Sequence, residues 1–301
     1  MRANTAAQYS TNVPELYPVI AELPDMSKLS PLSGNDLAEV MEFLSIRPVH
    51  TVVMSSLIRD NGIESDQNRG KFFGYRGNRS QLVGVALIGH STFVEAHTND
   101  ALRAFAFAAR TSQTPIHLIM SDDDNASEFW RIYSGGSRQP RLSCTELLFE
   151  TAFPYLVREN AWDIRNAVPT ELMEVAEAQA EVAFRESGID PMVRDRDGFL
   201  ARVERRIEQD RVFVVYRDGK LVFKADVVAQ TDDVSYLEGV WVAPEWRGQG
   251  VGSACLAKLN LMLLPQTPHV CLLSNVEETA AHRSFQKAGF RQSGQCTTIF
   301  V

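Results

Sequence analysis

The sequence lacks long apolar runs, cysteine pairs and an apolar N-terminal core. No stretch approaches ~18 consecutive apolar residues, the length of a membrane-spanning helix, so we expect no membrane partner. The polar N-terminus does not resemble a signal peptide. The cysteines Cys144, Cys255, Cys271 and Cys296 include no C-x-x-C pair, and we expect them to be reduced. Together these absences predict a soluble cytoplasmic protein.

Basic charge is also scarce. The chain has 30 Lys and Arg against 38 Asp and Glu, a net charge of −8 and a pI near 5.4. A nucleic-acid-binding protein needs a basic surface, so we expect no nucleic-acid partner. The six histidines are dispersed, and neither a metal-ligand pattern nor a Ser/His/Asp arrangement emerges. An acidic surface suits an amine-bearing partner, although many enzymes are acidic without such a partner.

The composition is that of a globular protein, and the length suits two domains. The chain has 301 residues, of which 45% are hydrophobic and 23% charged. Hydrophobic periodicity predicts the same order of elements twice: two helices, three strands, helix, strand, helix and strand. We therefore expect an α+β fold with an N-terminal arm at 1–30, one domain at 31–152 and another at 158–301.

The most distinctive stretch, 236–256, reads YLEGVWVAPEWRGQGVGSACL. An apolar, β-branched segment precedes a loop with Arg247, Gly248, Gly250 and Gly252, and a helical pattern follows. Glycine lets the backbone turn tightly and approach a ligand. The first N–H groups of a helix have no internal partner and carry partial positive charge. This stretch therefore predicts a phosphate-binding turn.

The first half lacks such a turn. At the equivalent position the chain reads His97-Thr98-Asn99-Asp100, which contains no glycine and carries an acid that would oppose phosphate. We therefore expect any cofactor to bind the second half.

The second half resembles the GCN5-related N-acetyltransferase (GNAT) family. Arg247, Gly250 and Gly252 match the family's Q/R-x-x-G-x-G/A loop, and the segment FQKAGF at 285–290 is similar to its Y-x-K-x-G-F ending. The resemblance covers about 160–301. With a first half that lacks the loop, the whole chain resembles tandem GNAT proteins.

The resemblance implies two GNAT-like domains, each a mixed, mostly antiparallel twisted sheet flanked by helices. It also implies acetyl-CoA, or another acyl-CoA, as cosubstrate. Loop N–H groups would hold the pyrophosphate. The backbone of Val240 and Val242 would pair with the pantetheine arm, and a splayed gap beside Val270–Ser274 would admit the thioester. The expected cofactor-binding residues are Val240, Trp241, Val242, Arg247, Gly248, Gln249, Gly250, Val251, Gly252, Ser253, Asn275 and Phe285.

In the family an amine attacks the thioester directly, while a main-chain N–H near Val242 polarises the carbonyl. The amine must be neutral, so a general base is required. Glu238 is the candidate, because strand alternation would place it on one face with Val240 and Val242. The alternative is that Glu238 pairs with a neighbouring Arg or Lys as part of the structure.

Other positions leave the acid–base assignment open. Phe285 stands where the family usually has a Tyr acid, although a CoA thiol can leave without much help. Asn275 contacts pantetheine or caps the helix near Glu277. Glu278 stands where Asn is common, and His282 is either an acid–base group or a packing residue.

Three functions are compatible with this reading. The first is acetyl transfer from acetyl-CoA to a primary amine on a small molecule or peptide. The second is a non-catalytic acyl-CoA sensor or partner-binding module. The third is transfer of a larger acyl or an amino-acyl group. The sequence leaves open the acceptor, the acyl chain and the choice between monomer and homodimer.

Overall fold

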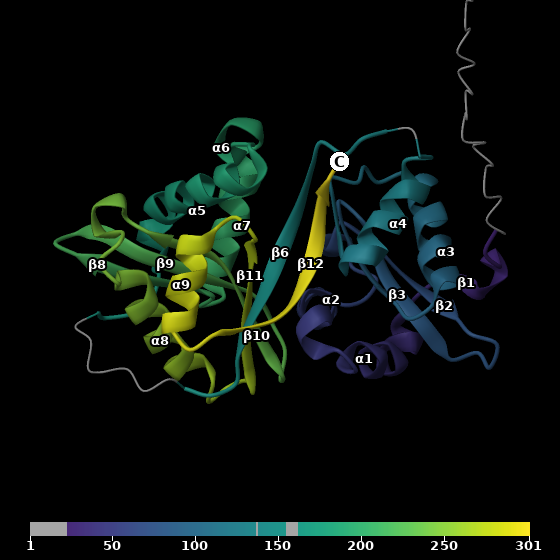
Figure 1. Cartoon of the computed structure of the whole chain (residues 1–301), viewed down its shortest axis with the longest axis horizontal. Coiled ribbons are helices and arrows are strands. Elements are labelled where there is room, and N and C mark those ends of the chain that lie inside the picture. Colours follow the sequence, from purple (N-terminus) through teal and green to yellow (C-terminus); the bar gives the residue numbers. More distant parts are fainter. Residues whose placement is uncertain (1–22, 137, 155–161) are drawn as a thin grey trace, which may run out of the picture.

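The computed structural model describes residues 23–136, 138–154 and 162–301 (Figure 1). Most of the expected N-terminal arm therefore lies outside the described residues. Its last residues belong to the short strand β1 (Leu29–Pro31), which pairs antiparallel with β2 (Gly70–Arg76).

The elements of the first half follow the predicted order. Pro48 begins the second helix, where its missing N–H is not needed, and Gly62 ends it with a φ of 89°. The remaining elements of this half are α1 (Leu37–Ser45), α2 (Pro48–Asn61), β3 (Leu82–Gly89), β4 (Ser91–Ala96), α3 (Asn99–Arg110), β5 (Leu118–Ser121), α4 (Asp123–Tyr133) and β6 (Leu142–Thr151).

The second half repeats this order with one addition. A short helix that periodicity does not predict begins at Pro191, where the Asp190 side chain accepts a hydrogen bond from the Met192 N–H. The elements are β7 (Arg165–Asn166), α5 (Leu172–Ser187), α6 (Pro191–Arg194), α7 (Arg196–Glu208), β8 (Val212–Arg217), β9 (Lys220–Gln230), β10 (Val234–Val242), α8 (Val251–Leu263), β11 (His269–Asn275), α9 (Thr279–Lys287) and β12 (Arg291–Phe300).

The described strands form one 12-stranded sheet in the order β1-β2-β3-β4-β5-β12-β6-β11-β10-β9-β8-β7. Among these strand pairs, β4–β5 and β10–β11 are parallel and the others antiparallel. The predicted fold class, a mixed and mostly antiparallel sheet flanked by helices, is confirmed.

The two halves exchange their last strands at the centre of the sheet. β6 of the first half pairs with β11 of the second, and β12 of the second half pairs with β5 of the first. β6 and β12 also pair with each other, and they lie side by side in the middle of Figure 1. Backbone hydrogen bonds therefore join the halves into one continuous sheet.

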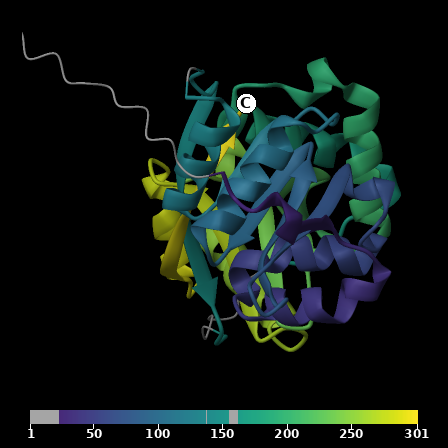
Figure 2. The same ribbon diagram turned by 90° about the vertical axis from the view of Figure 1, so that its right-hand side faces the viewer.

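Helices cover both faces of the sheet. On one face, Val52 of α2 packs against Leu148 and Tyr236, so a helix of the first half covers strands of the second. On the opposite face, Leu259 of α8 belongs to a core that includes Phe149. Figure 2 shows the purple α1–α2 region and the yellow C-terminal region on different sides of the sheet.

The four cysteines all lie among the described residues, where they are buried and form no disulfide. Among the described helices, none combines the length and apolar character needed to cross a bilayer.

Candidate functional site

A β-bulge interrupts β10 directly after Glu238. Glu238 lies opposite Asp226, and Trp241 lies opposite Lys224, so β10 carries one residue more than β9 between these pairs. Gly239 lies in the bulge with a φ of 61°, a conformation that favours glycine. Its carbonyl accepts a hydrogen bond of 3.3 Å from the buried Lys224 ammonium. The extra residue reverses the alternation of side chains beyond it.

The bulge places Glu238 on a different face from the valines that follow. Val240 and Val242 pack with Leu237 on the core beneath α8 and α9. Glu238 stays on the face of Tyr236, whose pKa is raised by burial and then by the nearby Glu238 charge. The expectation that Glu238 shares a face with Val240 and Val242 is therefore wrong, because it assumed an unbroken strand.

The parallel strands β10 and β11 separate beyond Leu237. Their pairing ends at Leu237 and Leu272. Beyond this point β10 remains paired with β9 as far as Val242, while β11 follows β6 to Asn275. The structure therefore has the splayed gap that was expected beside Val270–Ser274.

The loop after β10 presents unpaired backbone donors. Gly248 and Gly250 have φ values of 74° and 83°, and Gly250 directly precedes α8. The first backbone N–H of this region that is paired within the described chain is that of Ala254, which donates to the Gly250 carbonyl. From Gly248 to Ser253, no backbone N–H has a partner among the described residues. Donors in this arrangement, at the start of a helix, are suited to binding an anion.

The side chain of Arg247 links this loop to α5. Its Nε donates to the Val242 carbonyl at 2.8 Å, and its guanidinium forms an ion pair of 2.8 Å with Glu181. The Trp241 indole N–H donates to the same carboxylate at 2.7 Å. Hydrogen bonds from Trp241 and Arg247 lower the pKa of Glu181. Arg247 therefore holds the loop in place through its side chain.

The loop opens into a groove of about 440 Å³, which we call the α8 groove. Ten of the twelve expected cofactor residues line it: Val240, Trp241, Val242, Arg247, Gly248, Gly250, Val251, Gly252, Ser253 and Phe285. Besides Arg247, three cations and one acid line it: Arg185, Arg283, Lys287 and Glu278. The groove is therefore positively charged on a protein of net charge −8.

Gln249 and Asn275 are not among the residues that line the α8 groove. The Gln249 side chain donates to the Glu245 carbonyl at 2.7 Å. The Asn275 side chain accepts a hydrogen bond of 2.9 Å from the Glu277 N–H, in the capping geometry that was the alternative for this residue.

Phe285 forms part of the groove wall and of the core behind it. Its ring meets Phe149 at 5.5 Å and Phe290 at 6.3 Å between centroids, both edge to face. His282 also lies against Phe149, and its Nε2 is 3.0 Å from the Asn275 carbonyl. This contact engages the ring nitrogen, so His282 has the environment of a packing residue.

Carboxyl groups gather around Glu238. Burial, followed by the nearby charges of Glu238 and Glu146, raises the pKa of Glu186 to about 8. Burial also raises the pKa of Glu146, which Thr298 counteracts with a hydrogen bond. Within the described chain no ion pair joins Glu238 to Arg or Lys, and its charge acts on the neighbouring Tyr236 hydroxyl.

The equivalent turn of the first half is closed by a side-chain cap. There, α3 begins at Asn99, and the Thr98 side chain accepts a hydrogen bond of 3.2 Å from the Ala101 N–H. The first half therefore caps its own helix where the second half leaves an open turn.

Sequence reasoning missed the cations Arg185, Arg283 and Lys287. They lie on α5 and α9, far along the chain from the loop motif. The i, i+4 spacing of Arg283 and Lys287, which puts both on one helix face, was the available signal.

Among the described residues, no group of three or more His, Cys, Asp or Glu side chains is arranged to hold a metal.

Part of the chain matches a known protein family. Residues 208–292 match the family described as an acetyltransferase (GNAT) domain. No curated protein matches the sequence significantly.

Solved structures match nearly the whole chain at low sequence identity. A Drosophila protein aligns over 91% of this chain and 98% of its own, with 12% identity and a TM-score of 0.68. A GNAT-family acetyltransferase from Colwellia psychrerythraea covers 91% and 99%, with 14% identity and a TM-score of 0.54. A tandem GNAT protein from the clavulanic acid biosynthesis pathway covers 91% and 97%, with 13% identity and a TM-score of 0.54. Residues 208–292 are therefore a GNAT acetyltransferase domain, in a chain that has the tandem GNAT fold.

Proposed function

We propose that the protein transfers an acetyl group from acetyl-CoA to a primary amine, with the acyl-CoA held in the α8 groove. The observation that carries this proposal is the run of unpaired backbone N–H groups from Gly248 to Ser253 at the start of α8. Donors at a helix N-terminus suit a pyrophosphate, and the helix dipole favours its charge. The domain boundaries 31–152 and 158–301 are part of the same proposal.

The groove fits the rest of this cosubstrate. Its cations complement the phosphates, and Arg283 and Lys287 of α9 line the same groove as the loop. Gly252 keeps the backbone of α8 close to β10, because a Cβ there would lie 3.3 Å from Val242 Cγ2. The free side of β10 beyond Leu237 offers main-chain groups to an extended pantetheine arm.

Glu238 is the proposed general base. It is exposed, lies at the start of the splay and faces the side of the sheet opposite Val240 and Val242. An amine arriving on that side attacks the thioester carbonyl, forming the C–N bond as the C–S bond breaks. The amine's proton passes to Glu238, directly or through water. A main-chain N–H of β10 near Val242 polarises the carbonyl.

The leaving thiolate takes its proton from solvent in this scheme. Phe285 lies among Phe149 and Phe290 and has no proton to give. A thiol has an ordinary pKa near 8.5, so its thiolate is a tolerable leaving group at neutral pH.

The same observation about Phe285 favours a second candidate function, binding of acyl-CoA without turnover. Calorimetric titration with acetyl-CoA, followed by turnover with a panel of primary amines, separates the two. We expect binding and CoA release that depends on the amine. Binding without turnover across the panel would favour the second function, and a lack of binding would reject both.

A further inference from the structure

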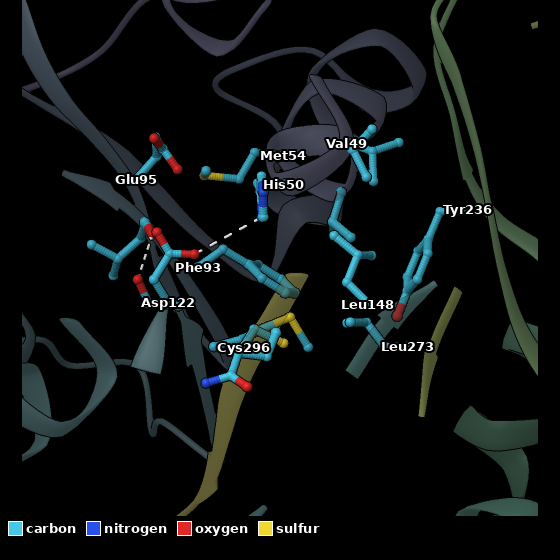
Figure 3. Close-up of a pocket in the computed structure, with 16 residues that line it drawn as sticks. Val49, His50, Met54, Phe93, Glu95, Asp122, Leu148, Tyr236, Leu273 and Cys296 are labelled. Atoms are coloured by element: carbon cyan, nitrogen blue, oxygen red, sulfur yellow. Dashed lines mark hydrogen bonds and ion pairs between the residues drawn. The ribbon is translucent and has the colours of Figure 1, made fainter. Parts of the chain in front are cut away.

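A second cavity lies between the two halves, on the face of the sheet that carries Tyr236 and Glu238. We call it the central cavity. The first half contributes α2, β4 and β5, and the rest comes from β6, β10, β11 and β12. Its middle is apolar, with Val53, Met54, Phe93, Leu148 and Leu273 among the lining side chains (Figure 3).

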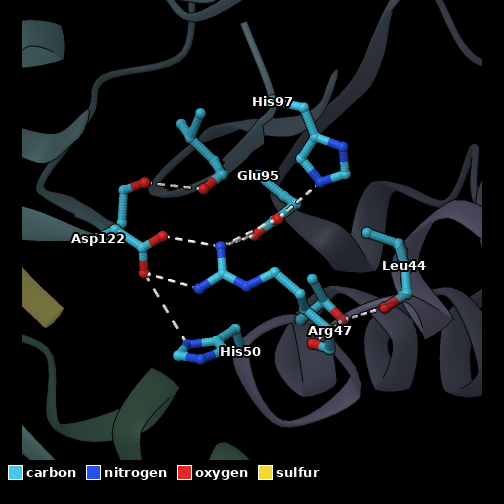
Figure 4. Close-up of polar contacts among 9 residues, drawn as sticks. Leu44, Arg47, His50, Glu95, His97 and Asp122 are labelled. Carbon is cyan, nitrogen blue, oxygen red and sulfur yellow. Dashed lines mark hydrogen bonds and ion pairs between the residues drawn. The ribbon is translucent and has the colours of Figure 1, made fainter. Parts of the chain in front are cut away.

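One end of the central cavity is polar. Arg47 lies between two carboxylates, at 3.2 Å from Glu95 and 2.7 Å from Asp122 (Figure 4). Burial and the charge of Arg47 lower the pKa of His50, so its ring is neutral at pH 7. Within the described residues, Glu95 and Asp122 therefore both pair with the guanidinium of Arg47. Asp122 keeps 37% of its side-chain surface exposed, and a carboxylate with two donors still has lone pairs to offer.

The other end leads to the proposed base. Figure 3 shows Glu95 and Asp122 on one side of the cavity and Leu148, Leu273 and Tyr236 on the other. Tyr236 lines the cavity, and Glu238 follows two residues further along β10 on the same face, near enough for its charge to act on the Tyr236 hydroxyl. Two strand residues span about 7 Å. The cavity therefore runs from an excess carboxylate at one end towards Glu238 at the other.

We propose that the central cavity is the acceptor site, and that the acceptor is a primary amine joined by a short apolar spacer to a second cationic group. The reacting amine lies at Glu238, the spacer lies along Val53 and Leu148, and the second cation meets Asp122. This assignment rests on the proposed acyl transfer and gives the first half, which lacks the glycine loop, the role of binding the acceptor.

The size of the cavity sets the length of the spacer. Its volume is about 60 Å³. One water-sized group needs roughly 10–15 Å³, so the cavity holds about four to six such groups. A spacer of about four to six carbons fits this space, whereas an amine with only polar groups would leave the apolar wall without contacts.

Matched probes test the second cation separately from the spacer. Initial rates of acetyl transfer are measured with hexane-1,6-diamine and with hexylamine, which differ in the second amine. A charged hydrogen bond contributes roughly 1.5–3 kcal/mol, so we expect kcat/KM to favour the diamine by about 10–100-fold. Asp122→Asn should bring the ratio close to one while leaving kcat/KM for hexylamine nearly unchanged.

A second variant tests the spacer. Val53 lines the cavity on α2 and is partly buried, so Val53→Trp should fill the space and raise KM for both amines at least tenfold. Acetyl-CoA affinity should stay the same in both variants, because the α8 groove lies elsewhere. Ile46→Trp and Asp66→Asn are the matched controls, since both residues are exposed and outside the cavity, and neither should change these values.

The outcomes separate this inference from the proposed function. If neither Val53→Trp nor Asp122→Asn changes the rate of acetyl transfer, the acceptor site is wrong, although acyl transfer itself still stands. The same conclusion follows if acetyl transfer proceeds only with other amines. If the protein shows no turnover, calorimetric titration with hexane-1,6-diamine tests the acceptor site by binding instead. Binding that is lost in Asp122→Asn would support the site, and absent binding would overturn it. Failure to bind acetyl-CoA would instead reject the proposed function.

Discussion

Glu95 in β4 and Glu238 in β10 occupy corresponding positions in the two halves of the sheet. Each lies two residues beyond an aromatic side chain, Phe93 or Tyr236, that lines the central cavity. Glu95 is buried and paired with Arg47, whereas Glu238 is exposed and its charge acts on the Tyr236 hydroxyl. The carboxylate of Glu95 is therefore neutralised by a cation, whereas that of Glu238 remains available.

Replacement of Glu238 by Gln should slow acetyl transfer at neutral pH by about 10²–10⁴-fold, the usual contribution of a general base. Acetyl-CoA affinity should be unchanged, because Glu238 does not line the α8 groove. Steady-state kinetics with a primary amine and calorimetry with acetyl-CoA measure the two effects. Glu208→Gln, an exposed change on α7, is the control. Full activity in Glu238→Gln would remove this residue from the mechanism.

Replacement of Gly250 by Glu should weaken acetyl-CoA binding by about 10–100-fold, a loss of roughly 1.4–2.8 kcal/mol. The side chain would bring negative charge to the start of α8, and the φ of 83° strains any residue but glycine. Gly219→Glu matches this strain, with a φ of 73° in the β8–β9 turn, away from the groove. Equal acetyl-CoA affinity in the two variants would contradict the placement of the pyrophosphate.

Stability should fall in mild acid because of His90, whose ring lies 4.2 Å from that of His117 between centroids. Burial, then the charge of Arg69, lowers the pKa of His90 from 6.5 to about 4. Between these two values the unfolded chain binds a proton that the folded chain does not. The free energy of unfolding therefore decreases as pH falls from 6.5 to about 4.

Urea unfolding of the wild type and of His90→Gln at several pH values checks this dependence. The variant should lose less stability than the wild type between pH 6.5 and 4, and the two should differ by a constant amount above pH 7. Parallel curves across the acidic range would show that His90 does not contribute.

Lys224 is fully buried and forms an ion pair of 2.7 Å with Asp226. Lys224→Met should lower the free energy of unfolding by about 3–5 kcal/mol, because it leaves the buried carboxylate with Arg206 alone and the Gly239 carbonyl without its donor. Lys220→Met changes the same residue type at the exposed start of β9 and should stay within about 0.5 kcal/mol. Chemical denaturation compares them, and equal stabilities would mean that the buried pair is dispensable.

The elements could be predicted from the sequence because each has a local cause. The apolar, β-branched segment expected before the glycine loop is the strand Val234–Val242, which ends before Pro244. The helix that was expected after the glycines begins at Val251, because Gly250 adopts a left-handed conformation. The loop residues that line the α8 groove lie next to one another along the chain, so their grouping followed from the motif.

Non-local relations were harder to predict. The bulge after Glu238 depends on how β10 pairs with β9, and strand alternation alone assigned Glu238 to the wrong face. The exchange of β6 and β12 depends on pairing between strands that lie well over a hundred residues apart. The contact between Arg47 and Asp122 likewise joins two segments that neither periodicity nor a motif connects.

The sequence by itself determined the order of the helices and strands and the position of the glycine turn, because periodicity and backbone conformation act over a few residues. Only the tertiary structure decided which face Glu238 occupies, and that the two halves share one sheet. It also brought carboxylates of the first half to a cavity beside Tyr236. These outcomes depend on pairing and packing between distant segments, which local patterns do not specify.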